Sequence, residues 1–375
     1  MRKVSALFAG LGLALTVAAG GGAANANSAA RVCPGSPIGT ASCHALVVGD
    51  GVGNPNATTS PTGLSPATIK SAYSYSTSST AGFGKTIAIV DAYDDPTAES
   101  DLAVFNNSFG LPACTTANGC FTKVNQTGGA NYPRKDAGWA LEISLDIQWA
   151  HAIAPGAKIL LVEASSNSFA NLLVAEDYAK THADYVSNSW GGSEFSGESS
   201  YDSHFVQSGV SFFVSSGDSG LPAQYPSASP NVISVGGTTL NFSGSIVSET
   251  GWSGSGGGCS VYETANSSQA TGQVNCNGKR ATPDVSLDAD PASGVSVYDT
   301  TRYQGQAGWF RVGGTSASSP MWAGRSAVAG TVVNSAYVYG NSITYRDITS
   351  GNNGASALTG YDLVTGRGSW IGSAP

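Results

Sequence analysis

The sequence predicts an α/β fold with a mostly parallel central sheet and helices on both faces. Two observations support this prediction. Short, continuously apolar segments alternate with longer helical stretches between residues 85 and 237, and the 375 residues suffice for one large domain with a sizeable core. Parallel strands joined by helices are buried on both faces, so they appear as unbroken apolar runs.

The expected strands are 85–91 (KTIAIVD), 157–164 (AKILLVEA), 185–190 (YVSNSW), 211–217 (SFFVSSG) and 232–237 (VISVGG). The expected helices are 97–107, 139–153, 170–182, 201–208 and 316–334. Residues 240–312 are rich in Gly and Ser, with short β-like pieces between turns. No internal repeat interrupts this order, so we expect one catalytic-type domain over residues 61–375.

The N-terminal residues have the pattern of a secretory signal peptide. Two basic residues precede an apolar run over residues 4–19, and small residues surround positions 24–26, which predicts residues 1–26 as a cleaved signal. The alternative is an uncleaved membrane anchor, but the run is short and interrupted by glycines. Residues 27–60 lack periodicity and form a short, disulfide-pinned leader or linker in this interpretation.

Composition excludes several classes of partner. Charged residues make up 11% of the chain, against about 25% in average proteins, so Ser, Thr, Asn and Gly must cover the surface. The formal net charge of −8 argues against nucleic acid and anionic membranes as partners. An exported chain leaves the reducing cytosol, so its six cysteines are expected as disulfides. Proximity favours three neighbour pairs among 15 connectivities: Cys33 with Cys43, Cys114 with Cys120, and Cys259 with Cys276.

Acidic residues follow the predicted strands, where an open α/β sheet places its site. Asp91 ends the first strand, and Asp218 lies in the Ser-Gly-Asp-Ser-Gly segment 216–220. The flanking Gly and Ser residues allow a tight turn that points the carboxyl into a cleft. The alternative for Asp218 is an ordinary Asx-type turn.

A second candidate is Ser316, in the sequence Gly-Gly-Thr-Ser that begins at Gly313. This Gly-rich bend places Ser316 at a helix N-terminus, where free backbone N–H groups can stabilise an oxyanion. The alternative is a serine that caps the helix. Small residues around the bend favour a nucleophile because they leave room for a substrate carbonyl.

A nucleophilic serine needs a base, and histidine is a poor candidate here. None of the four histidines lies in a His-Gly-Thr setting: His44, His151, His182 and His204. Glu142 and Asp146 stand four residues apart, on one face of a helix that is apolar on nearly every side. Like charges buried at this spacing repel, so such a pair is expected to share a proton. The alternative is two acids on a solvated stripe.

Together, Glu142-x-x-x-Asp146, the 216–220 segment and Gly-Thr-Ser-Ala-Ser at 314–318 resemble the sedolisin, or serine-carboxyl, peptidases. These are similar to subtilisins with His replaced by Glu, and the resemblance runs from about residue 63 to the C-terminus. It implies a subtilisin-like α/β fold in which Ser316 is the nucleophile, Glu142 the general base and Asp146 its orienting partner. Asp218 would be the protonated donor to the oxyanion.

The resemblance implies further site residues. Asp91 and Trp190 would support the site, and Trp190, Gly191 and Gly192 would edge a groove where a peptide adds as a strand. One structural Ca²⁺ would be bound near the C-terminus. Its ligands would be the side chains of Asp347 and Asp362 and the backbone oxygens of Ile348, Leu358 and Gly360. Without the resemblance, this stretch has the composition of a polar surface loop.

The sequence therefore predicts a secreted, acid-active serine endopeptidase that forms an acyl-enzyme and acts on protein or peptide substrates. We expect a monomer without nucleic-acid or membrane partners. An alternative is a catalytically inactive secreted binding protein on the same fold. A carbohydrate-binding module does not explain the buried acidic helix. The leader of about 34 residues is shorter than the folding propeptide usual in this family, so it either serves that purpose or the domain folds unassisted.

Overall fold

The computed structural model describes residues 28–35, 37–50, 54–244, 246–274, 276–340 and 342–372. The predicted signal peptide, residues 1–26, lies outside the described residues.

A ten-stranded sheet forms the centre of the molecule, in the order β18-β19-β15-β11-β9-β7-β4-β6-β5, with β12 beside β11. All its pairings are parallel except β11 with β12 and β18 with β19. Its strands are β4 (Thr86–Ala92), β5 (Phe121–Asn125), β6 (Lys158–Ala164), β7 (Tyr185–Asn188), β9 (Ser211–Ser215), β11 (Ile233–Ser243), β12 (Ile246–Gly251), β15 (Val285–Asp288), β18 (Tyr345–Arg346) and β19 (Ser369–Trp370). The predicted, mostly parallel central sheet is confirmed.

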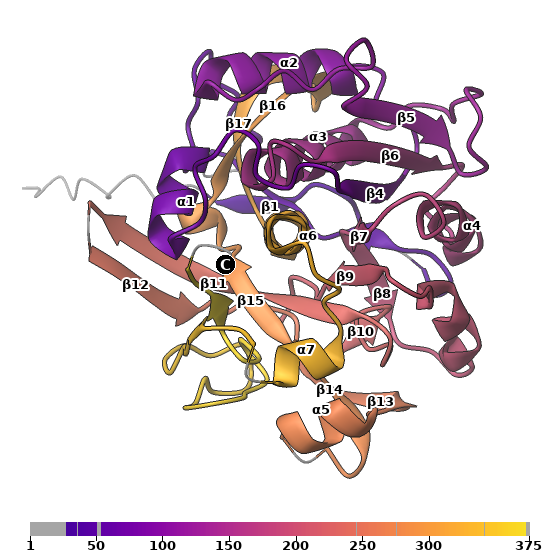
Figure 1. The fold of residues 1–375 in the computed structure, drawn as a ribbon, viewed down its shortest axis with the longest axis vertical. Helices are drawn as coiled ribbons and strands as arrows, with labels where there is room; N and C mark the ends of the chain where they lie inside the picture. The colour runs from indigo at the N-terminus through magenta and orange to yellow at the C-terminus, as the bar shows by residue number, and fades with distance from the viewer. Residues whose placement is uncertain are drawn as a thin grey trace, which may run out of the picture.

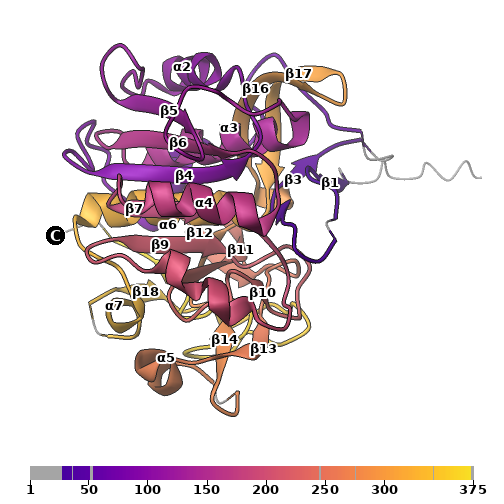
Figure 2. The same ribbon diagram turned by 90° about the vertical axis from the view of Figure 1, so that its right-hand side faces the viewer.

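Helices cover both faces of this sheet. Figures 1 and 2 show α3 and α6 on one face and α4 on the other. The α-helices are α1 (Pro66–Tyr73), α2 (Ala98–Phe109), α3 (Ala137–Ile153), α4 (Phe169–Ala179), α5 (Ser267–Gly272), α6 (Thr315–Ala329) and α7 (Ser335–Tyr339). The side chains of Asp136 and Ser168 cap the N-termini of α3 and α4. The left-handed Gly330 ends α6.

Smaller sheets flank the central one: β1-β3-β17-β16, β10-β8-β2 and β13-β14. Their strands are β1 (Ala29–Arg31), β2 (Ser42–Cys43), β3 (Leu46–Val48), β8 (Trp190–Ser193), β10 (Gln224–Tyr225), β13 (Gly258–Thr264), β14 (Lys279–Thr282), β16 (Val295–Tyr303) and β17 (Gln306–Gly313). β16 packs on α3, and Figure 1 shows it on the side of α3 that faces α2.

The helix predicted at 316–334 ends at Ala329, and the strand predicted at 232–237 extends to Ser243. Two further predicted elements differ in kind. The strand expected at 185–190 divides at Ser189, because the chain leaves the central sheet there and pairs, as β8, with β2 and β10. The helix expected at 201–208 is a 3₁₀ helix over Glu198–Phe205, which starts after the left-handed Gly197 and ends where Val206 becomes extended. A second 3₁₀ helix covers Pro291–Ser293.

The leader is paired into the body of the protein. Figure 2 shows β1 and β3 beside β17; β3 pairs with both. β2, which contains Cys43 of the Cys33–Cys43 disulfide, pairs with β8. The three predicted disulfide pairs, Cys33–Cys43, Cys114–Cys120 and Cys259–Cys276, are all confirmed. Among the described residues, no helix combines the length and apolar character that crossing a membrane would require.

Candidate active site

Helix α3 lies in the core and contains Glu142 and Asp146. Every residue of α3 from Gly138 onward is buried, in agreement with its sequence, which is apolar on nearly every side. Two side chains fix its position against β16. The Gln148 amide exchanges two hydrogen bonds with the backbone of Tyr298, and the Trp149 indole donates to the carbonyl of Ser296 at 2.9 Å. Glu142 and Asp146 are therefore held on a rigid element.

The acids of α3 form a carboxyl cluster with Asp91, at the end of β4. All three side chains are fully buried, and none of their oxygens has a hydrogen-bond partner among the described residues. Burial raises the pKa of Glu142 well above its usual value, and the nearby Asp146 and Asp91 raise it further. Burial likewise raises the pKa of Asp146 and of Asp91, and Asp146 and Glu163 add to the effect on Asp91. Carboxyls in such a site hold protons or share them.

Ser316 lies in the first turn of α6. Its backbone N–H, which has no partner within the helix, donates to the carbonyl of His44 at 3.1 Å. Its hydroxyl donates to the carbonyl of Ser189 at 3.3 Å. The same hydroxyl is close enough to Glu142 to counteract the rise of the Glu142 pKa, although the two groups do not have the geometry of a hydrogen bond. The serine and the carboxyl pair therefore meet at the N-terminus of α6.

Asp218 approaches the N-terminus of α6 from the segment after β9. Its Oδ1 accepts from the Thr315 backbone N–H at 2.8 Å and from the Thr315 hydroxyl at 2.9 Å. Its Oδ2 is buried and has no partner among the described residues. Burial raises the pKa of Asp218 to about 7, although Thr315 and Arg31 oppose the rise. Because Oδ1 already accepts two donors, a proton on this carboxyl belongs on Oδ2.

The histidines lie outside the carboxyl cluster. His151 points at the carbonyl of Pro112 (3.0 Å), and His204 contacts Asp177 (2.9 Å). His182 contacts the carbonyl of Tyr178 at 2.8 Å, on the surface. The side chain of His44 points away from the cluster, toward the Ser215 hydroxyl at 2.7 Å.

The segment expected to edge the substrate groove is strand β8. The Trp190 side chain is buried under this strand, where its indole donates to the carbonyl of Val90 at 2.9 Å. Gly191 and Gly192 continue the strand and pair with β2 and β10, respectively. The edge predicted to receive a peptide is thus paired with residues 42–43 of the same chain.

The candidate calcium residues lie in one C-terminal loop. Asp347 Oδ2 accepts from Gly360 N, and Asp362 Oδ2 accepts from Leu358 N, which draws the two halves of the loop together. Asp362 Oδ1 accepts the backbone N–H groups of Val364 and Thr365. No hydrogen bond within the described ranges uses the carbonyls of Ile348, Leu358 or Gly360, and no lysine or arginine there pairs with either carboxylate. Two carboxylates and free carbonyls fit a hard cation.

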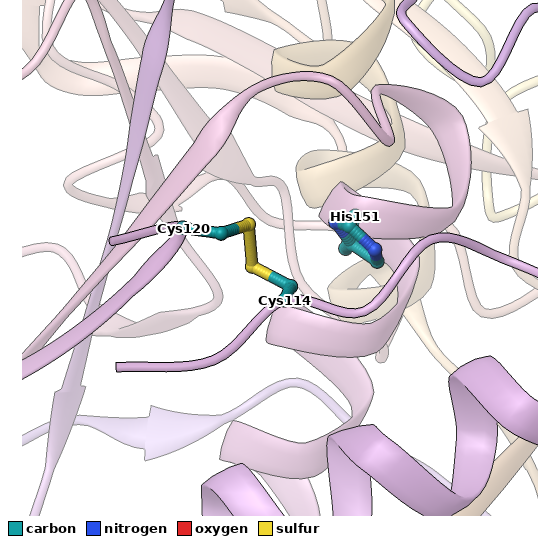
Figure 3. Close-up of side chains that lie close together, drawn as sticks. All are labelled: Cys114, Cys120 and His151. Atoms are coloured by element: carbon teal, nitrogen blue, oxygen red, sulfur yellow. A yellow bond between two sulfur atoms is a disulfide. The ribbon is translucent and has the colours of Figure 1, made fainter. Parts of the chain in front are cut away.

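A second cluster of side chains that can bind metals in other proteins consists of Cys114, Cys120 and His151. His151 lies beside Cys114 and Cys120, with potential ligand atoms within 4.8 Å of one another (Figure 3). The two sulfurs are joined in a disulfide, so neither is a thiolate that could bind a metal.

Sequence patterns assign no role to three residues near the site: Arg31, His44 and Gln224, the last of which contacts the His44 ring. Arg31 influences both Asp218 and His44, and His44 meets Ser316 through its backbone. The positions of these three residues depend on the pairing of short strands that are far apart in the sequence, and such pairing leaves no local sequence pattern.

The fold and the site define a class of protein: a subtilisin-like α/β fold with a serine at a helix N-terminus and a buried carboxyl cluster beside it. The model of the subtilase family matches residues 129–348. The chain therefore belongs to the subtilase family. Its relatives place it with the sedolisins, as the resemblance in sequence predicted.

Three curated relatives are similar in sequence to this chain. Kumamolisin of Bacillus sp. (strain MN-32) is 32% identical over 365 residues, which cover 83% of this chain and 63% of kumamolisin. Xanthomonalisin of Xanthomonas sp. (strain T-22) is 29% identical, covering 72% and 41%. Sedolisin of Pseudomonas sp. (strain 101) is 34% identical, covering 43% and 33%. The chain spans less than two thirds of the length of each of these relatives.

Solved structures agree with the fold. A Pseudomonas sedolisin, a serine-carboxyl proteinase complexed with two molecules of pseudo-iodotyrostatin, matches with a TM-score of 0.70 and 29% identity, covering 83% of this chain and 96% of that one. Sphericase matches with a TM-score of 0.53 and 18% identity, covering 81% and 97%. The sphericase match supports the subtilisin-like fold alone.

Proposed function

We propose that this protein is a secreted, acid-active serine-carboxyl endopeptidase. Its membership of the subtilase family and its similarity to sedolisin and kumamolisin support the reaction class. One observation carries the proposal for this chain: Ser316, in the first turn of α6, faces the buried pair Glu142 and Asp146, while the free Oδ2 of Asp218 lies at the same helix end.

Each group then has one task. The Ser316 hydroxyl attacks the substrate carbonyl and passes its proton to Glu142, which Asp146 supports by sharing the proton of the pair. The backbone N–H of Ser316 and a proton on Asp218 Oδ2 stabilise the oxyanion. Collapse of the intermediate breaks the C–N bond, and the proton held by Glu142 goes to the leaving amine. Water then hydrolyses the acyl-enzyme by the reverse route.

The neighbouring residues support this arrangement. Asp91 adds a third carboxyl that keeps protons in the cluster, and the Trp190 side chain anchors β8 beside the site. An extended peptide would pair with Trp190, Gly191 and Gly192, so the substrates are proteins or peptides. The predicted signal peptide and the three disulfides support secretion. We propose a monomer, without nucleic acid or membrane as partner.

We also propose one structural Ca²⁺ in the C-terminal loop. Asp347 and Asp362 would provide carboxylate oxygens, and Ile348, Leu358 and Gly360 would provide carbonyls. The ion would supply charge that holds these loop segments together. It takes no part in the peptide-bond chemistry proposed for Ser316.

Replacement of the nucleophile tests the proposed function. Ser316→Ala removes one hydroxyl, and loss of a nucleophilic serine in such enzymes commonly costs on the order of 10⁴-fold or more in turnover. Hydrolysis of a denatured protein at about pH 4 should vanish while the circular dichroism spectrum stays unchanged. Ser326→Ala, a buried serine on the same helix that bonds only to its own turn, should keep its activity. Proteolysis that persists in Ser316→Ala contradicts the assignment.

A further inference from the structure

A pocket of about 450 Å³ lies where α6 meets the C-terminal strand β19. Its lining includes two arginines, Arg325 and Arg346, two aromatic residues, Tyr337 and Trp370, and several serine and threonine residues. No aspartate or glutamate is among the described residues that line it. Arg325 and Ser316 lie about 13 Å apart along the axis of α6, so this pocket is separate from the carboxyl cluster.

Arg325 is a buried cation without a counter-ion. The residue is 1% exposed, and its Nη2 donates to the carbonyl of Gly372 at 3.1 Å. Its Nε and Nη1 have no hydrogen-bond partner among the described residues. The guanidinium carbon lies 3.9 Å from the centre of the Trp370 ring and 5.4 Å from that of Tyr75. Aromatic faces attract a cation, but they do not neutralise its charge.

Two other arginines provide an internal comparison. Arg280, which is similarly buried, pairs with Asp284, and Arg346 pairs with Glu249 at 2.6 Å. No carboxylate within the described part of the chain forms an ion pair with Arg325 or acts on its pKa. A charge that leaves water without a partner costs much more free energy than a paired one. An anion beside Arg325 would remove most of this cost.

The net positive charge of the lining comes from Arg325, because Glu249 neutralises Arg346. Burial lowers the pKa of Arg325, and Tyr75 and Tyr337 oppose this effect. A guanidinium nevertheless stays protonated in proteins, so the pocket keeps its charge. This charge stands out on a chain whose formal net charge is −8.

The rest of the lining favours an organic anion over an inorganic one. The rings of Tyr337 and Trp370 have their centres 6.1 Å apart and form an aromatic wall. Ser74, Ser342 and Thr344 are exposed at the rim, where their hydroxyls can donate hydrogen bonds. The volume is within the range of about 300 to 1,000 Å³ that is typical of pockets for small organic molecules. An inorganic oxyanion would fill only a small part of it.

We propose that this pocket binds an organic carboxylate. Its acid group pairs with Arg325, and its apolar part packs against Tyr337 and Trp370. The carboxyl end of a peptide and a free organic acid share this chemistry. Such a ligand connects α6 with β19 and stabilises the folded protein by mass action. Binding does not require peptidase activity, so its failure would leave the proposed function untouched.

The first test compares N-acetylphenylalanine with its amide by isothermal titration calorimetry on the full-length protein at about pH 5.5. The carboxyl of the acid, with a pKa of about 3.5, is ionised at this pH. Hydrogen bonds to a charged group should make the acid bind about 10- to 100-fold more tightly than the amide. Equal affinities, or no binding of the acid up to about 10 mM, overturn the proposal.

A variant assigns the binding to Arg325. Arg325→Met removes the charge but keeps an unbranched side chain that can pack on Trp370, so it should abolish the preference for the acid over the amide. The matched control is Arg302→Gln, because Arg302 is exposed and its guanidinium bonds only to the nearby carbonyl of Gly305. This control should bind like the wild type. Unchanged affinity of Arg325→Met for the acid contradicts the proposal.

A crystal soaked with the 4-bromo derivative of N-acetylphenylalanine locates the ligand by the anomalous scattering of bromine, even where Arg325→Met does not fold. Bromine beside Tyr337 and Trp370 supports the proposal. Bromine in the cleft at Ser316 instead means that the acid occupies the active site, which overturns it. Inorganic phosphate that binds as tightly as the acid also overturns it, because the pocket would then accept any anion.

A peptide that ends in phenylalanine, with a free or an amidated carboxyl end, distinguishes the two sources of the carboxylate. The titration uses Ser316→Ala, which should leave the peptide intact. Tighter binding of the free peptide than of N-acetylphenylalanine supports a peptide end as the ligand, and weaker binding supports a free acid. Equal binding of the free and the amidated peptide, together with equal binding of the acid and its amide, overturns the proposal.

Discussion

At the scale of single residues, carboxyls of one chemical type lie in different environments, which is why the proposed mechanism gives them different tasks. Glu142 and Asp146 are buried on one helix, and the hydroxyls of Ser316 and Ser189 only partly oppose the rise of their pKa values, so the two carboxyls are expected to share protons. Asp218 instead has one oxygen fixed by Thr315, and the other oxygen, which has no partner among the described residues, lies where the proposed mechanism places the oxyanion. The first pair suits a base, and the second arrangement suits a hydrogen-bond donor.

This difference predicts unequal effects of two substitutions at Asp218. Asp218→Asn keeps an acceptor for Thr315 and places an N–H₂ donor at the Oδ2 position, whereas Asp218→Ala removes both. Removal of one oxyanion donor costs about 10²- to 10³-fold in turnover. We expect Ala to show this loss at about pH 4, and Asn to retain far more activity than Ala near neutral pH.

The measurement is kcat of both variants at about pH 4 and about pH 7. Equal activity of the Asn and Ala variants at both pH values contradicts the role of Asp218 as a donor. A melting temperature for each variant separates lost donation from lost structure.

At the scale of elements, helices α3 and α6 hold the residues for which catalysis is proposed, and hydrogen bonds to Asp347 and Asp362 join the two halves of the C-terminal loop. Helix α3 was predictable because its sequence is apolar on nearly every side, a pattern that only a buried helix satisfies. The i, i+4 spacing placed Glu142 and Asp146 on one face of this helix. The position of Ser316 at a helix N-terminus was predictable from the Gly-rich bend before α6. The 3₁₀ geometry of 198–205 was not, since its turn signals do not distinguish it from a short α-helix.

The C-terminal loop gives the prediction at this scale. If Asp347 and Asp362 hold Ca²⁺, chelation should lower the melting temperature by several degrees and added calcium should restore it, because an ion that binds only the folded state stabilises it. The informative variant is Asp347→Asn, whose side chain can still accept from Gly360 N. Asp362 also fixes the loop backbone of Val364 and Thr365, so its substitution perturbs the fold regardless of metal.

Differential scanning calorimetry measures the melting temperatures of the wild type and of Asp347→Asn, each with chelator and with calcium. The wild type should respond to calcium and Asp347→Asn should respond much less. An identical melting temperature of the wild type in chelator and in calcium rules out a stabilising ion in this loop.

At the scale of the whole molecule, pairing between strands far apart in the sequence determines where the leader lies, which local sequence patterns do not predict. The order of β4, α2, α3, β6, α4, β7, β9 and β11 followed from local periodicity, but β5, which lies between α2 and α3, and the docking of the leader did not. β2 is two residues long and pairs with β8 almost 150 positions away, so no periodic signal marks it. His44 was visible only as a histidine without a catalytic motif, and its contact with Ser316 depends on this pairing.

The buried acids also make global stability depend on pH in a defined direction. The pKa of Asp218 is raised to about 7 in the folded state, against about 3.9 for an unfolded aspartate. The folded state therefore holds more protons between these values. This contribution to stability is fully present below about pH 4 and is lost as the pH rises toward 7. Glu142, Asp146 and Asp91 shift in the same direction.

The pH–rate profile of peptide hydrolysis tests the central claim of serine-carboxyl chemistry most directly. We predict highest kcat/KM at roughly pH 3 to 5, where a proton on Asp218 coexists with a shared charge on Glu142 and Asp146. The rate should fall as Asp218, with its pKa of about 7, ionises. Circular dichroism at each pH, and recovery on return to acid, separate this from unfolding. A rate that rises to a plateau above about pH 7, as a histidine base with a pKa of about 6.5 gives, contradicts the account.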